Sequence, residues 1–273
     1  MIKRTASAAL RAILVASVIA MPAMILPGAR PDTIQIVALL SLVAAVLTFV
    51  EYWSEYPSLI EFRSAPPFNR MRFVALFATV LVLSLICRSD SMPTGVGGAL
   101  SSIGIQIGAA MDFPFSPVRL MVLAASDDVT AEAIRINAGL AYMISLVALL
   151  AFVAIVRLLN WPIRKGAFNF WVNLPLFDPT AGGDVLLRLK RDSHVNVALG
   201  FLLPFFVPAV LKSMAAYGMA VNFSDPHTLI WVTTAWAFLP SSLIMRGVAL
   251  MRIADLIEEK RRRAYAQTEL QVA

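Results

Sequence analysis

The apolar residues of this chain fall in six long runs, and the segments between them hold most of the charged residues. A helix needs roughly 20 apolar residues to cross a hydrocarbon core of about 30 Å, and each run approaches or exceeds that length. Strands of a membrane barrel would instead alternate polar and apolar residues over about ten positions. The pattern predicts an all-α polytopic integral membrane protein, with one helical domain over residues 1–260 and a cytoplasmic tail at 261–273. The expected membrane helices cover residues 9–27, 33–53, 73–88, 136–159, 195–217 and 229–251.

Composition agrees with this pattern. Hydrophobic residues make up 59% and charged residues 15% of the 273 positions, whereas soluble domains average roughly 45–50% and about 25%. The net charge of +6 could suggest nucleic-acid binding, but the basic residues are confined to segments between and after the apolar runs. We therefore expect membrane lipids and no nucleic acid as partners.

The orientation follows from Lys and Arg, which accumulate on the cytoplasmic side of short loops. The segments expected outside carry only Arg30, Arg88, Arg119 and Arg135, and the other segments carry the remaining basic residues. We expect both termini to be cytoplasmic and the protein to lie in a bacterial inner (plasma) membrane. The first run also has features of a cleaved signal peptide, although it is longer than a signal core of about 7–15 residues.

Residues 89–135 form a long extracytoplasmic segment that is too apolar for a plain loop and too interrupted to span. Backbone at membrane depth must be satisfied inside protein or by water, so we predict an interfacial or re-entrant hairpin. Gly104 and Gly108 have the small-xxx-small spacing that lets helices approach closely. They are candidate helix-packing residues, although this spacing is also common by chance.

The cytoplasmic loop at 160–194 contains an aromatic run that is too short to span. Such a segment must lie among headgroups, fold against its own bundle or be covered by a partner. Because aromatic side chains are the usual anchors of interfaces, we predict a docking surface for a partner. Its candidate residues are Phe168, Phe170, Trp171 and Phe177.

Ionisable residues within membrane helices are candidate functional sites by default. Glu51, Lys212 and Arg246 lie near helix ends, where their charges can reach headgroups, so we expect Lys212→Arg and Arg246→Lys to be tolerated. Prolines in the fifth and sixth runs free backbone carbonyls that could line a cavity, but nearby serines or packing can also satisfy them. A polar pocket is expected in this pair of helices, if anywhere. Its candidate residues are Pro204, Pro208, Lys212, Pro240, Ser241 and Arg246.

Residue chemistry gives no support for catalysis. With Cys87 as the single cysteine, neither an intramolecular disulfide nor a cysteine metal site can form. His194 and His227 are expected on opposite sides of the membrane, too far apart to clamp a haem. The sequence has no nucleotide-binding loop, no Gly-x-Ser-x-Gly, no His-Glu-x-x-His and no Cys-x-x-Cys. We expect no enzyme activity, no cofactor and no metal.

These features favour a non-enzymatic accessory or scaffold subunit of a larger membrane assembly. Its partner would be another membrane protein or a second copy of the chain. The alternative is a small-solute or ion transporter that uses the proline-kinked fifth and sixth runs. A transporter is expected to carry buried polar residues at mid-membrane, and these runs have almost no charge there.

The topology predicts the accessibility of tags. A tag at either terminus should be cytoplasmic, and a tag near Gly95 should react with impermeant reagents from outside. Labelling in intact cells and in inverted vesicles measures both. Protection of the Gly95 tag in intact cells would contradict the six-helix map.

Overall fold

The computed structural model describes residues 2–28, 30–91, 95–159, 161–162, 169–178, 180 and 182–272. All regular secondary structure in these ranges is helical. The helices are α1 (Ile2–Ile25), α2 (Pro31–Trp53), α3 (Phe68–Ser91), α4 (Gly95–Met111), α5 (Pro117–Val122), α6 (Asp128–Leu158), α7 (Phe170–Asn173), α8 (Val185–Ala216) and α9 (Pro226–Val272). Within these ranges, α1, α2, α3, α6, α8 and α9 are the helices long and apolar enough to cross a membrane. The prediction of an all-α multi-pass membrane protein is confirmed.

The six membrane-length helices begin before their apolar runs, and aspartates cap the starts of α6 and α8. Asp127 caps α6 by accepting a hydrogen bond from the backbone N–H of Thr130 at 2.8 Å. This bond, with those from the Ser126 and Thr130 hydroxyls, holds the pKa of Asp127 below its usual value. Asp184 caps α8 in the same way through the N–H of Leu186. The apolar runs therefore predicted helix starts that lie several residues after the observed ones.

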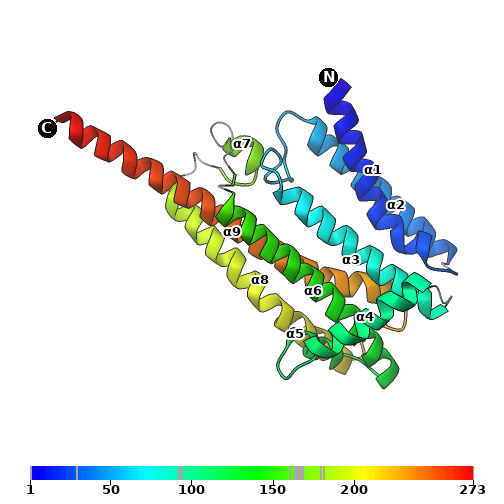
Figure 1. Ribbon diagram of the computed structural model, residues 1–273. Helices are drawn as coiled ribbons and strands as arrows, with labels where there is room; N and C mark the ends of the chain where they lie inside the picture. The colour runs from blue at the N-terminus through cyan, green and yellow to red at the C-terminus, as the bar shows by residue number, and fades with distance from the viewer. Residues whose placement is uncertain are drawn as a thin grey trace.

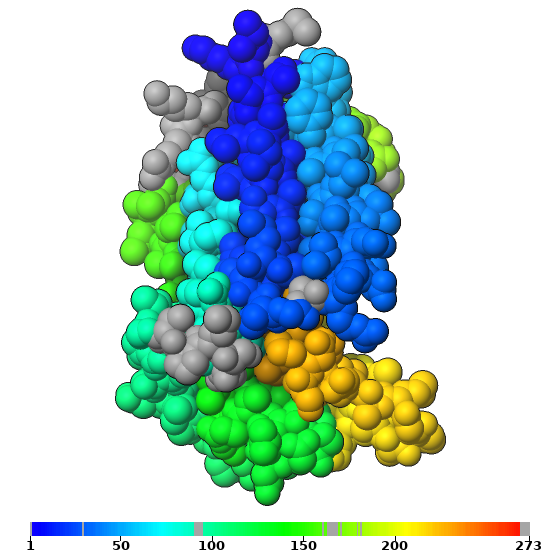
Figure 2. Space-filling model, turned by 90° about the vertical axis from the view of Figure 1, so that its right-hand side faces the viewer, coloured from blue at the N-terminus to red at the C-terminus, as the bar shows by residue number. Residues whose placement is uncertain are grey.

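The central helix of the bundle is α9, which packs against α8, α6 and α3. α1 and α2 form a hairpin, and α1 joins this hairpin to the bundle mainly through α3 (Figure 1). The hairpin covers much of the face shown in Figure 2. Both termini lie at one end of the molecule, which we call the terminal end, and α4 and α5 lie at the opposite, far end (Figure 1).

At the terminal end, α8 and α9 project together as a two-helix stalk (Figure 1). Lys190 pairs with Glu258 at 2.6 Å, and Asp184 pairs with Arg261 at 2.8 Å. The Arg261 guanidinium lowers the pKa of Asp184, so this contact contributes when the carboxyl is ionised and is lost as the pH falls through its folded-state pKa. Beyond Arg261 the last part of α9 continues as a single helix (Figure 1).

At the far end, glycines set the distance between α4 and α6. A Cβ atom on Gly104 would lie 2.7 Å from a side-chain carbon of Ile136, and one on Gly108 would lie 2.8 Å from the backbone oxygen of Arg135. A Cβ on Gly139 would lie 2.7 Å from the Cα of Gly108. The predicted packing residues thus lie in a close contact between the two helices, and Gly139 adds a third glycine to it.

This contact predicts that Gly108→Val destabilises the protein. The added side chain meets backbone, which cannot move aside as a flexible side chain can, so we expect a loss of about 1–3 kcal/mol. Gly98→Val is the matched control, because a Cβ there meets nothing within 4 Å on the same helix. Cys87 is buried, so its reaction with a maleimide dye during heating reports unfolding. Equal melting temperatures for the two variants would contradict the packing role.

Candidate functional site

The loop at 54–67, between α2 and α3, is shaped by Glu51 at the end of α2. This side chain is only 5% exposed, and its carboxylate accepts hydrogen bonds from the backbone N–H groups of Ser58, Leu59 and Ile60. These N–H groups satisfy the carboxylate inside the protein, in place of the water that it would bind among the headgroups. The expectation that Glu51 extends to the headgroups is therefore wrong, because the carboxylate organises the loop that follows its helix.

The side chain of Arg246 also does not extend to the headgroups as expected. Its guanidinium makes a bidentate ion pair with Glu61 of the loop, with contacts of 2.5 and 2.7 Å. The side chains of Arg246 and Glu61 are 27% and 9% exposed. The headgroup interpretation of Arg246 is wrong, because its charge is used inside the protein to join α9 to the loop.

Four aromatic rings close the terminal end beside this pair. Phe62 and Phe68 have ring centroids 4.6 Å apart, and Phe152 lies 5.4 Å from Phe68. Trp161 completes the group, at 5.6 Å from Phe62 and 5.5 Å from Phe152. Its indole N–H donates to the carbonyl oxygen of Ala65 at 3.3 Å. We call the loop at 54–67, these rings and α7 the terminal cap.

The predicted docking residues have different surroundings. Phe168 lies outside the described residues, as does the side chain of Phe170. Phe177 is 7% exposed and lies in the apolar core of the cap, where the Arg188 guanidinium stacks on its ring at 4.6 Å. Trp171 is 56% exposed. Phe177 is thus covered by its own chain, and Trp171 is exposed.

A short hydrogen-bond network holds α7 in the cap. The N–H of Phe62 donates to the carbonyl oxygen of Asn173 at 2.6 Å. The N–H and hydroxyl of Ser64 donate to the side-chain oxygen of Asn173 at 3.0 and 2.9 Å. Asn173 is buried, and so is Leu174. The exposed indole of Trp171 is therefore carried by an anchored segment.

The prolines of α8 and α9 lie in a close helix contact. Pro208 has no N–H, so the carbonyl oxygen of Pro204 loses its helical donor. The indole N–H of Trp236 on α9 donates to that oxygen at 2.9 Å. On the same interface, a Cβ atom on Gly200 would lie 2.6 Å from the carbonyl oxygen of Pro240. The freed carbonyl is satisfied between the helices.

The other candidates for a polar pocket do not converge on these prolines. Ser241 donates to the carbonyl oxygen of Phe238 within its own helix. Lys212 is exposed near the C-terminal end of α8, and Arg246 is paired with Glu61 at the other end of the bundle. The predicted pocket stays a prediction, without a shared site for these two cations.

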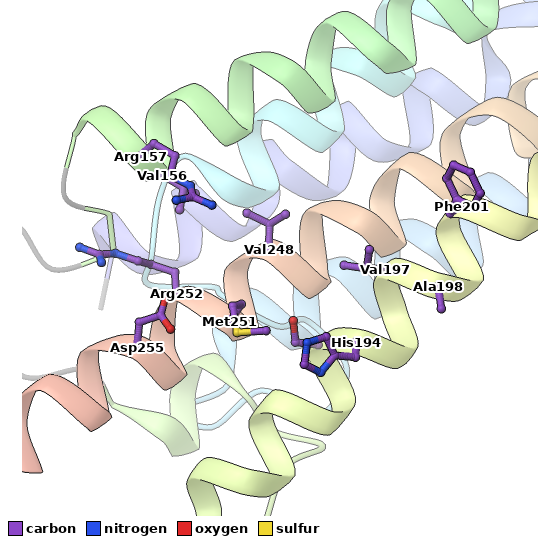
Figure 3. Close-up of a pocket in the computed structure, with 11 residues that line it drawn as sticks. Val156, Arg157, His194, Val197, Ala198, Phe201, Val248, Met251, Arg252 and Asp255 are labelled. Carbon is purple, nitrogen blue, oxygen red and sulfur yellow. The ribbon is translucent and has the colours of Figure 1, made fainter.

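A different pocket, of about 820 Å³, lies between α6, α8 and α9 (Figure 3). Its lining includes Arg157, His194, Phe201, Arg252 and Asp255. Sequence reasoning missed it because these residues come from three separate runs. The available signal was the group of cations at the ends of those runs. Among the described residues, no three His, Cys, Asp or Glu side chains gather as a metal site.

The ion pair predicts that Arg246 is far less replaceable than Lys212. Arg246→Leu leaves Glu61 without its partner; breaking a fully buried pair costs about 3–5 kcal/mol, and this partly buried pair should cost less than that. Arg246→Lys should lose less, because it keeps the charge and gives up the bidentate geometry. Lys212→Arg should melt like wild type. Melting of all three variants at the wild-type temperature in the Cys87 assay would contradict a structural role for the pair.

Any inference of function rests on the geometry of the described residues. Comparisons with protein-family profiles, with curated proteins and with solved structures gave no match. The described residues form a helical, multi-pass membrane protein with an internally bonded terminal cap. The cap and the pocket are the two features from which a function can be inferred.

Proposed function

We propose that this chain is a non-enzymatic accessory or scaffold subunit of a membrane assembly, and that the terminal cap docks its partner. The observation that carries the proposal is Trp171, a large aromatic side chain that is 56% exposed on an anchored segment. Tryptophan is enriched among the residues that dominate binding energy at interfaces. An exposed tryptophan held in place is therefore suited to act as an anchor.

The rigidity of the cap strengthens this reading. Asn173 fixes α7 to the loop at 54–67, and Glu61 fixes that loop to Arg246 on the central helix. A side chain presented by such a framework loses little conformational freedom when it binds. The partner would be another membrane protein or a second copy of this chain.

The closed contacts of the cap favour a scaffold over a carrier. Alternating access requires elements to open and close around a central site, and the bonds of the cap join α9, the loop and α7 at one end. One observation favours the alternative of a small-solute or ion transporter. The buried hydroxyls of Ser145 and Thr234 have no hydrogen-bond partner within the described part of the chain.

Sidedness is part of the same proposal. The stalk and the end of α9 carry many basic residues, among them Lys190, Lys260, Arg261, Arg262 and Arg263. Because cytoplasmic segments are enriched in Lys and Arg, we assign the terminal end to the cytoplasm of a bacterial cell. A cytoplasmic partner domain, or the cytoplasmic face of a membrane partner, would then meet the cap.

Replacement of Trp171 tests the proposal. Trp171→Ser should release the partner and reduce the mass of the gently extracted complex, while the Cys87 melting curve stays at the wild-type position. Trp53→Ser is the matched control, because Trp53 is 49% exposed at the same end of the bundle. Light scattering of the detergent extract measures the mass.

Two outcomes would decide against docking at this site. A complex of unchanged mass in Trp171→Ser would remove the cap as the docking surface. An equal loss in Trp53→Ser would show that general apolar area, and not this anchor, holds the complex. Uptake of a solute by purified protein in vesicles, abolished by replacing Ser145 or Thr234 with Ala, would favour the transporter.

A further inference from the structure

We propose that the pocket between α6, α8 and α9 binds a phospholipid with an anionic headgroup, taken from the leaflet at the terminal end. α6 and α8 each pack against α9 but, in the ranges described, not against each other. α9 therefore forms the floor of a groove whose walls are α6 and α8. A groove of about 820 Å³ that opens between two membrane helices faces the acyl chains of the bilayer.

The lining changes from charged to apolar along the groove. Figure 3 shows Arg157, Arg252 and Asp255 at one end and Phe201 at the other, with Val248 between them. On α8 the lining extends from Ser193 to Phe201, a rise of about 12 Å at 1.5 Å per residue. The apolar part suits an acyl chain, and the charged part lies at the end where a headgroup would be.

The two arginines are suited to a phosphate. Arg252 donates from Nε to the carbonyl oxygen of Trp161 at 3.2 Å, which helps to position its guanidinium beside the pocket. Arg157 has no hydrogen-bond or ion-pair partner within the described part of the chain, and it lies at the last turn of α6. Guanidinium groups match the geometry of phosphate oxygens, and basic pockets between membrane helices bind anionic headgroups.

Asp255 refines the choice of headgroup. The formal charges of Arg157, Arg252 and Asp255 give the charged end a net charge of +1. A carboxylate repels phosphate but accepts hydrogen bonds from hydroxyl groups. A glycerol headgroup supplies both parts, the phosphate for the arginines and hydroxyls for Asp255. An apolar helix from a partner would fill the same groove but leave both guanidinium groups without an anion.

Native mass spectrometry of the purified full chain tests the site. The probes are phosphatidylglycerol and phosphatidylcholine with identical acyl chains. Wild type should bind phosphatidylglycerol about tenfold more tightly, the effect expected for one or two basic residues near a headgroup. Arg157→Gln with Arg252→Gln should remove this preference, and Arg157→Gln alone should remove part of it. Ala198→Trp, which fills the groove, should weaken binding of both lipids.

The matched control is Arg262→Gln with Arg263→Gln, which removes the same charge from exposed positions on the end of α9. This variant should keep the wild-type preference. Equal binding of the two lipids by wild type would overturn the proposal, as would a preference that survives in the Arg157 and Arg252 variant. Binding that is unchanged in Ala198→Trp would place the lipid elsewhere. A wild-type assembly larger than one chain that Ala198→Trp dissociates, without lipid binding, would assign the groove to a partner helix.

Discussion

The ion pair between Arg246 and Glu61 connects the terminal cap to the central helix, and the other contacts of the cap depend on where it places the loop. Glu51 folds the first part of that loop, and Glu61 then reaches α9. Asn173 attaches α7 to the same loop. A buried ion pair adds little net stability compared with an apolar pair, but its geometry selects one arrangement of the groups it joins. Here the pair holds the loop at 54–67 beside α9, and Asn173 bonds α7 to that loop.

Each end of the bundle combines close packing with polar contacts. Lipid tails are as apolar as leucine, so membrane helices gain little from hydrophobic burial against each other and rely on close packing and polar contacts. At the far end, Gly108 of α4 packs against Gly139 of α6, and Asp112 pairs with Arg135 of α6 at 2.8 Å. At the terminal end, the packed aromatic rings lie beside the hydrogen bonds of Asn173 and the Arg246 pair. Between them, Trp236 satisfies the carbonyl that Pro208 leaves free.

The sequence was sufficient for the features that depend on local composition. Apolar run length predicted the six membrane helices, and small-residue spacing predicted the close face of α4. It was insufficient where partners are far apart in the chain. Arg246 and Glu61 are separated by 185 positions, so nothing near Arg246 indicated that its charge would be paired inside the protein. Phe177 and Trp171 belong to one aromatic run, and only the fold of the cap determines that one is buried and the other exposed.

The position of α2 has a consequence for how this chain can evolve. Among the helices, α2 packs against α1 alone, and almost none of its most apolar stretch is buried within the protein. Lipid distinguishes poorly between leucine, isoleucine and valine, so most positions of α2 can drift among these residues as long as the helix stays apolar. Glu51 is the exception, because its carboxylate bonds the loop that follows. Relatives of this chain should thus preserve the hydropathy of α2 more strictly than its residues, and should keep an acid at its last turn.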